Sequence, residues 1–299
     1  MMDLLTGFPS DFHSCRTETF MRRCDDVADW AEMFSCAAEQ GVDGILLQSM
    51  FDHGTVVPKE ILRTYGGRLA AQHHLHRQLR AIEGRVAQEF AAAGIRALAL
   101  YGPSFDERIG ALEAGRGSAS RLSFLVSRQD LAAASALLAE YDGAFIQLRS
   151  GLQNGMNDLD VDSILRRAMR YETTWGARLW IPAPEDELIL LATDIAARDF
   201  GRLAWLYDLR LFIESYCELE SGTILGRAVA LGIDAVFEGI MELLEDCLGI
   251  GLDYVGRTNS WAPLNGSPME ERVAWHLADD VLADAVSTSW GLRLWAQKP

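Results

Sequence analysis

The acidic and hydroxyl side chains between two apolar runs are the first candidates for chemistry in this sequence. The runs, Ile95 to Leu100 and Leu122 to Val126, each have the length of a buried strand and are bounded by turn-forming residues. The connection between them carries Ser104, Asp106 and Glu107 together with several glycines. Carboxylates can hold a divalent cation, and a glycine- and serine-bearing loop after a strand can cradle phosphates. We therefore expect two adjacent strands joined by a loop that forms a candidate site.

Two groups of histidines have part of the spacing that a metal site needs. His73 and His76 would share one face of a helix and His74 would not, but no carboxylate stands one turn away. We interpret all three as solvated helix surface. His276 is followed by two aspartates at helical spacing, but one short helix supplies too few ligands for a metal site. We assign no metal to either group.

The composition predicts a globular chain and limits its partners. The chain has 299 residues, 49% hydrophobic and 23% charged, so it can bury a large core. Its formal net charge of −16 argues against nucleic acid as the main partner, because phosphate contacts need clustered cations. Lys59 and Lys298 are its only lysines. An anion site would therefore rely on arginine, backbone amides or a metal ion.

The sequence shows no signal peptide, membrane span or disulfide framework. Met1 to Phe12 lacks a basic region followed by a sustained apolar segment, and no apolar run reaches about 18 residues. The five cysteines have neither the density of a disulfide scaffold nor the spacing of a zinc site, which indicates reduced thiols. We expect a cytoplasmic protein with no membrane partner.

Helical periodicity surrounds the apolar runs and dominates the second half of the chain. Helices are expected over 25–40, 42–50, 60–93, 129–140 and 161–170, with a third short strand over 144–148. From Pro184 onward the chain looks helical, and the acids Glu185, Asp186 and Glu187 fall in a first turn, where they complement the helix dipole. The later helices are expected over 202–216, 223–231, 236–248 and 269–286.

This order predicts an α+β fold, with a small mixed sheet and flanking helices followed by a mainly helical C-terminal region. We divide the chain into an N-terminal arm (1–24), an α/β region with N-terminal helices (25–180) and a helical region packed on it (181–248). The last part (249–299) contains a linker, a last helix and a tryptophan-rich tail. The tail is expected either to dock on the core or to form a subunit contact, and both alternatives stay open.

Beyond these patterns, the order of several segments resembles the uncharacterised-nucleotidyltransferase family, a bacterial branch of the polymerase-β-like nucleotidyltransferase superfamily. The resemblance runs from about Trp30 to Phe212. It rests on the fragments GIRALALYG, RLSFLVS followed by a helix, ILRRA, LWIPAPEDELILLA and LAWLYDLRLFI, in this order. It implies a nucleotidyltransferase-like sheet on which acidic residues of two strands hold Mg²⁺ ions that neutralise a triphosphate.

The sequence departs from the family's pattern at each functional position. The Leu-Lys-Gly that ends the first strand becomes Leu100-Tyr101-Gly102, the Asp-x-Asp pair falls on Arg121 and Ser123, and the last carboxylate falls on Gln147. A cation at a metal position repels the metal by an energy on the order of several kcal/mol. The resemblance therefore implies a pseudoenzyme that has lost its metal-binding acids.

Two hypotheses of different classes follow. In the preferred one, the chain acts by binding a small anionic ligand, a nucleotide or a protein partner, and needs no cofactor. Guanidinium groups and backbone amides, in the cleft where the family's acids would bind metal, would hold an anion without a metal ion. The expected ligand-binding residues are Tyr101, Gly102, Ser104, Arg121, Ser123, Gln147 and Arg149.

In the alternative, the chain is an active Mg²⁺-dependent nucleotidyltransferase with relocated acids. Asp106 and Glu107 would be catalytic and, with Asp160 and Asp162, would bind the metal, while Ser104 would contact phosphate. A third idea is an accessory protein of a biosynthetic or regulatory assembly, in which the tryptophan-rich tail forms an interface. Homo-oligomerisation stays open under each of these ideas.

Overall fold

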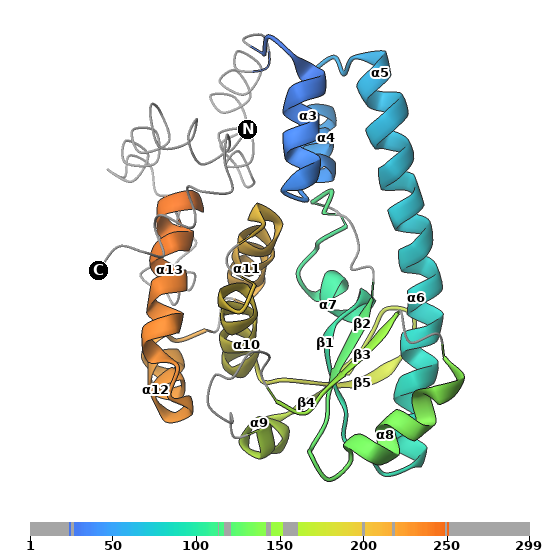
Figure 1. Ribbon diagram of the computed structural model, residues 1–299, viewed down its shortest axis with the longest axis vertical. Coiled ribbons are helices and arrows are strands. Elements are labelled where there is room, and N and C mark those ends of the chain that lie inside the picture. Colours follow the sequence, from blue (N-terminus) through green and yellow to red (C-terminus); the bar gives the residue numbers. More distant parts are fainter. Residues whose placement is uncertain are drawn as a thin grey trace.

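A computed structural model of the chain (Figure 1) supplies the structure. It describes Cys24, 27–112, 114–116, 121–141, 145–151, 161–198, 201–216, 219–248 and Ile250. The predicted N-terminal arm lies almost wholly outside these residues, as do the linker, last helix and tryptophan-rich tail. His276 and Asp160 lie outside them too.

A five-stranded mixed sheet forms the centre of an α+β fold, in the order β3-β2-β1-β5-β4. β1 is antiparallel to β2 and parallel to β5, while β2 is parallel to β3 and β4 is antiparallel to β5. The predicted fold class and its first three strands are confirmed. The strands are β1 (Leu98–Tyr101), β2 (Leu122–Leu125), β3 (Ile146–Arg149), β4 (Met169–Glu172) and β5 (Arg178–Ile181).

The strands β4 and β5 were not predicted, and the helix expected over 161–170 was too long. That helix, α9, ends at Arg167, and β4 starts two residues later. The side chains of β4 are mostly exposed. An edge strand with polar residues on it has no apolar run, so periodicity could not separate it from a helix end.

Several helices precede the sheet or lie between its strands in the sequence. The expected helix over 60–93 is divided by a π-helical turn, and the connection between the first two strands contains a short helix that the sequence did not predict. These elements are α3 (Trp30–Glu39), α4 (Asp43–Asp52), α5 (Lys59–Ile61), η1 (Leu62–Gly66), α6 (Gly67–Ala92), α7 (Pro103–Arg108), α8 (Leu131–Leu137), η2 (Leu138–Glu140) and α9 (Val161–Arg167).

The C-terminal part of the described chain is helical, as predicted. Its first helix begins with Pro184 at a position where the missing N–H costs nothing. Among the described residues, no helix is both long enough and apolar enough to cross a membrane. The C-terminal helices are α10 (Pro184–Ala196), α11 (Leu203–Ser215), α12 (Ser221–Leu231) and α13 (Asp234–Leu248).

The sheet separates two hydrophobic clusters, because successive side chains of a strand point to opposite faces. On one face, Leu122 and Phe124 of β2 pack with Val86 and Phe90 of α6. On the other face, Leu125 belongs to the larger cluster that α10, α11 and α13 build. Figure 1 shows α6 on one side of the sheet and α10 to α13 on the other.

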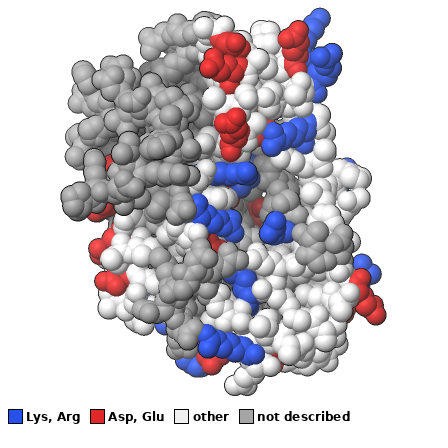
Figure 2. Space-filling model, in the orientation of Figure 1, with Lys and Arg blue, Asp and Glu red and all other residues white. Residues whose placement is uncertain are grey.

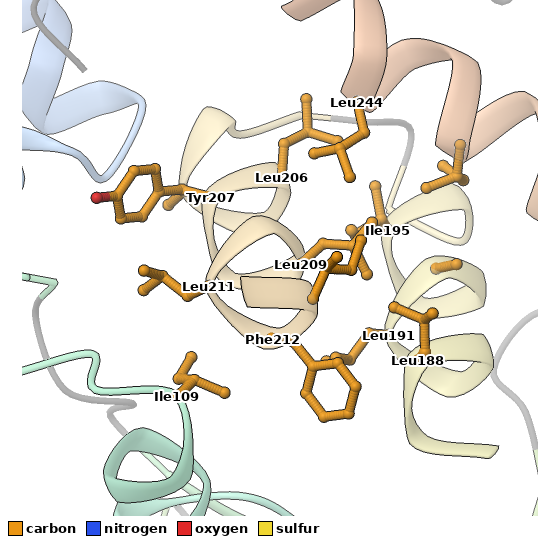
Figure 3. Packing of buried hydrophobic residues seen from close by; sticks show 14 of the residues in the cluster. Ile109, Leu188, Leu191, Ile195, Leu206, Tyr207, Leu209, Leu211, Phe212 and Leu244 are labelled. Atoms are coloured by element: carbon orange, nitrogen blue, oxygen red, sulfur yellow. The ribbon is translucent and has the colours of Figure 1, made fainter. Parts of the chain in front are cut away.

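The larger cluster joins α10 and α11 tightly. Figure 3 shows Leu188 and Leu191 of α10 facing Leu209 and Phe212 of α11, with Leu244 of α13 nearby. All of these side chains are almost completely buried. Burial of one such side chain contributes about 1.5–3 kcal/mol. This packing therefore fixes the position of α10, and with it the side chains of α10 that face the sheet.

Candidate functional site

Four of the seven predicted ligand-binding residues share one face of the sheet. Tyr101 of β1 is paired with Ser123 of β2, and Ser123 is paired with Gln147 of β3. Gln147 and Arg149 alternate with Ile146 and Leu148, which pack on the α6 side, so both lie on the face toward α10. We call Tyr101, Ser123, Gln147 and Arg149 the sheet-face site. The row holds no carboxylate where the family resemblance expects acids.

Arg149 is paired with a carboxylate that the sequence analysis did not single out. Its Nη1 and Nη2 both donate to Asp194 of α10 at 2.6 Å, and both side chains are buried. Such a two-bond geometry is the strong form of an arginine–carboxylate pair. Burial, with the neighbouring charge of Asp194, raises the pKa of Tyr101 well above its ordinary value. The phenol therefore stays neutral beside the ion pair at ordinary pH.

Arg198 adds an exposed cation to the edge of this site. Its Cζ lies 6.0 Å from the ring centroid of Tyr101 and 5.0 Å from that of Trp205. Within the part of the chain that the structure describes, neither Arg198 nor the exposed Arg121 has a carboxylate partner. The attraction of a cation to aromatic faces holds the Arg198 guanidinium, and the carboxylate of Asp208, which Arg116 already pairs, adds a Coulomb attraction from further away. Both arginines can therefore accept an anion.

Two buried polar atoms of the sheet-face site have no hydrogen-bond partner among the residues that the structure describes. They are the hydroxyl of Ser123, a residue that is 2% exposed, and the Nε of Arg149, a residue that is 6% exposed. Most buried polar atoms in proteins are paired, and an unpaired one costs about 1–3 kcal/mol.

Gly102 and Ser104 lie behind the site and not on its surface. Ser104 is fully buried, and its amide and hydroxyl donate to the carboxylate of Glu83 of α6 at 3.0 and 2.7 Å. Gly102 has a φ of +149°, and a Cβ there would stand 2.8 Å from an oxygen of Glu83. Gly102 leaves room for the carboxylate of Glu83, and Ser104 binds it with both of its donors. Ser104 therefore has no donor left for a ligand.

Glu83 is buried and has no ion pair among the described residues, although the charge of Arg108 acts on it. Burial raises its pKa from 4.5 to about 7, although the two hydrogen bonds from Ser104 act in the opposite direction. The sequence pattern gave no sign of this role, because Glu83 stands on a long helix that is rich in charged residues.

The acids of the alternative enzyme hypothesis point to separate partners. Asp106 lies 3.2 Å from Nδ1 of His76, whereas Glu107 accepts hydrogen bonds from the hydroxyls of Tyr171 and Thr174 at 2.7 and 2.9 Å. Asp162 is exposed on α9. Among the described residues, no three or more His, Cys, Asp or Glu side chains gather in a way that could hold a metal ion.

The interpretation of the histidines as solvated surface is wrong for His76. This residue is 1% exposed, because its face of α6 packs against α7. Nε of Arg80 donates to its Nε2 at 3.0 Å, so Nδ1 carries the proton that faces Asp106. His76 thus links α6 to α7.

The three acids at the start of α10 act as ion-pair partners as well as first-turn residues. Glu187 takes two hydrogen bonds from Arg108 of α7, and Asp186 lies between Arg167 of α9 and Arg227 of α12. Both acids are almost completely buried. Together with the pair formed by Arg149, these contacts tie α10 to the elements around it.

Figure 2 shows Lys and Arg side chains gathered over the middle of one face of the molecule. This grouping contrasts with the net charge of −16 of the whole chain. Local arginine clusters on an acidic protein can draw anions to one place.

The chain was compared with protein-family models, with curated proteins and with solved structures, and none of them matches it. The resemblance to the uncharacterised-nucleotidyltransferase family therefore stays a prediction, and the function has to be argued from the geometry of the site.

Proposed function

We propose that this protein is a nucleotidyltransferase-like pseudoenzyme that binds a small anionic ligand at the sheet-face site without a metal ion. The observation that carries the proposal is the row Tyr101–Ser123–Gln147, in which Tyr101 meets Ser123 after an irregularity of β1 and Ser123 is paired with Gln147; the row holds no carboxylate, and Arg149 follows Gln147 on the same face of β3. The hydroxyl of Ser123 and the Nε of Arg149, which have no hydrogen-bond partner among the described residues, support it, because a buried donor without a partner calls for an explanation and a bound group would supply one.

The charge of the ligand is met by the arginines that are not neutralised. Asp194 already balances the charge of Arg149. The Arg149 guanidinium can therefore offer its Nε–H as a hydrogen-bond donor, but it adds little net positive charge. Arg198 and Arg121 are exposed and have no carboxylate partner among the described residues. A planar guanidinium matches phosphate and carboxylate oxygens with two parallel hydrogen bonds. Nucleotides belong to the ligand class that this arrangement fits.

Calorimetric titration tests this proposal. The probes are ATP, CTP, GTP, UTP and inorganic phosphate, each added to the purified protein in EDTA. We expect at least one probe to bind, and Arg198→Ala to weaken its affinity by about tenfold or more, because a charge-assisted hydrogen bond contributes about 1.5–3 kcal/mol.

The control is Arg63→Ala, which removes another exposed arginine, on η1 and away from the sheet (Figure 1). This variant should bind as the original protein does. Absence of binding for all five probes, or an unchanged affinity in Arg198→Ala, would contradict the proposal.

A further inference from the structure

The strand β4 forms an open edge of the sheet in the part of the chain that the structure describes. It pairs with β5 on one side and is the last strand in the sheet order. In an antiparallel pair, alternate residues turn their backbone N–H and C=O groups away from the partner strand. Half of the four residues of β4 therefore present these groups outward, where another strand can pair with them.

One face of this edge carries arginines around a tryptophan. Arg170 of β4 is directly opposite Trp180 of β5, and its Cζ lies 4.7 Å from the Trp180 ring centroid. Arg96, which precedes β1, places its Cζ 4.8 Å from the same centroid and donates to the backbone oxygen of Leu165. The ring thus holds two guanidinium groups by cation–π attraction.

The strands β4 and β5 do not supply enough carboxylates to neutralise the arginines on this face. Among the described residues, Arg96 and Arg170 have no carboxylate partner. Arg178 lies on the same face, 3.5 Å from Glu172, and the two side chains are 81% and 62% exposed. An exposed pair of this kind contributes little. Three arginines therefore face a single acid, in a chain whose net charge is −16.

From this charge pattern and the open edge, we propose that β4 binds an extended acidic segment of a partner protein by strand addition. The backbone of the segment pairs with the outward groups of β4. Its acidic side chains, at every second position, lie on the face of Arg170 and Arg178, as the two-residue period of a strand requires. The proposal rests on other residues than the sheet-face site does, because Arg170 belongs to β4, which is the edge strand at the opposite end of the sheet from β3.

Fluorescence polarisation with a labelled peptide of alternating Glu and Thr tests the interaction. We expect saturable binding that weakens as salt is added, since exposed charges are screened. Arg170→Glu should weaken it by about tenfold or more, because it replaces an attraction with a repulsion. The exposed side chain of Arg170 makes no hydrogen bond in the described structure, so the variant should fold, and circular dichroism checks this.

Two further probes separate strand addition from simple charge attraction. One peptide carries N-methyl groups on the amides of its Glu residues, and the other carries them on the amides of its Thr residues. Strand addition predicts that one of the two loses binding, because only alternate amides face β4. Equal binding of both methylated peptides would overturn the proposal.

The control variant is Arg63→Glu on η1, which should bind the unmodified peptide as the original protein does. A single-stranded oligo-dT probe tests the competing class of partner. Oligo-dT binding that Arg170→Glu abolishes, with no peptide binding, would identify a nucleic-acid surface and overturn the proposal.

Discussion

Among single residues, Glu83 has the environment that is least typical of its type. It is completely buried, and its only direct partners in the described structure are the two donors of Ser104. Its pKa is raised from 4.5 to about 7, mainly by burial. The folded state therefore binds the Glu83 proton more tightly than the unfolded state does, and ionisation of this group destabilises the fold.

The pH dependence of stability tests this account of Glu83. Its contribution is fully favourable below about pH 4.5 and is lost as the pH rises through about 7, by an amount on the order of 3 kcal/mol. Glu83→Gln removes the titrating group. Urea unfolding at pH 5 and pH 8 should therefore show that the original protein loses roughly 2–3 kcal/mol more than the variant between these two pH values. An equal loss in both proteins would show that Glu83 titrates normally.

Two buried serines allow a matched comparison. The Ser123 hydroxyl has no partner, whereas the Ser104 hydroxyl donates to Glu83 at 2.7 Å. Ser123→Ala should raise the free energy of unfolding by about 1 kcal/mol, because it removes an unpaired buried hydroxyl. Ser104→Ala should lower it by about 2 kcal/mol, because a hydrogen bond to a carboxylate is lost. Denaturation curves measure both, and a destabilised Ser123→Ala protein would mean that this hydroxyl is paired.

At this scale, the sequence could predict part of the site. Ser123 and Gln147 were assigned through the family resemblance, and each falls between apolar residues of a short run, as strand alternation requires, whereas Arg149 stands at the end of its run. The residues with which the site residues pair could not be predicted from the sequence pattern. Asp194 meets Arg149 across 45 positions of sequence, and Glu83 meets Ser104 across 21. Such pairings depend on how helices pack on the sheet, which a periodicity pattern does not contain.

Among the elements, α10 carries several ion pairs that join the sheet region to the helical region. Its carboxylates meet Arg149 of β3, Arg108 of α7 and Arg167 of α9. Each pair is largely or partly buried, so removal of one partner would leave a charge without compensation. These ion pairs fix the position of α10 over the face that holds the sheet-face site.

A double-mutant cycle on the pair between β3 and α10 measures this effect. Arg149→Met or Asp194→Leu alone should each lower the free energy of unfolding by about 3 kcal/mol or more, because a buried charge loses its partner. The combined variant should return to within about 1 kcal/mol of the original protein, because neither charge remains. Additive losses in the combined variant would show that the two residues act independently.

Element prediction succeeded for several strongly buried elements, although the partly buried strand β5 was missed. The strands β1 and β2 were predicted because their side chains are apolar and buried, and the C-terminal helices were predicted from regular apolar spacing. The strand β4 was not, because an exposed edge strand needs no apolar run. The short helix α7 was hidden in a connection rich in turn formers, where Pro103 starts a helix of only six residues.

On the scale of the whole molecule, an acidic chain places its arginines in two different settings. Arginines that face α10 are paired with carboxylates, whereas Arg198, Arg121, Arg96 and Arg170 are exposed without such partners among the described residues. The first group holds the fold together. The second group lies at the sheet-face site and at the edge formed by β4, which are the two places where we propose binding.

The most direct test of the proposed function compares ATP binding in EDTA and in Mg²⁺ by calorimetry of the original protein. An arginine-lined site whose carboxylate, Asp194, is already paired with Arg149 should bind ATP in EDTA at least as tightly as in Mg²⁺, because Mg²⁺ on the phosphates competes with guanidinium groups for the same oxygens. ATP binding that requires Mg²⁺ would contradict this account and would point to a metal site built from the chain's acids.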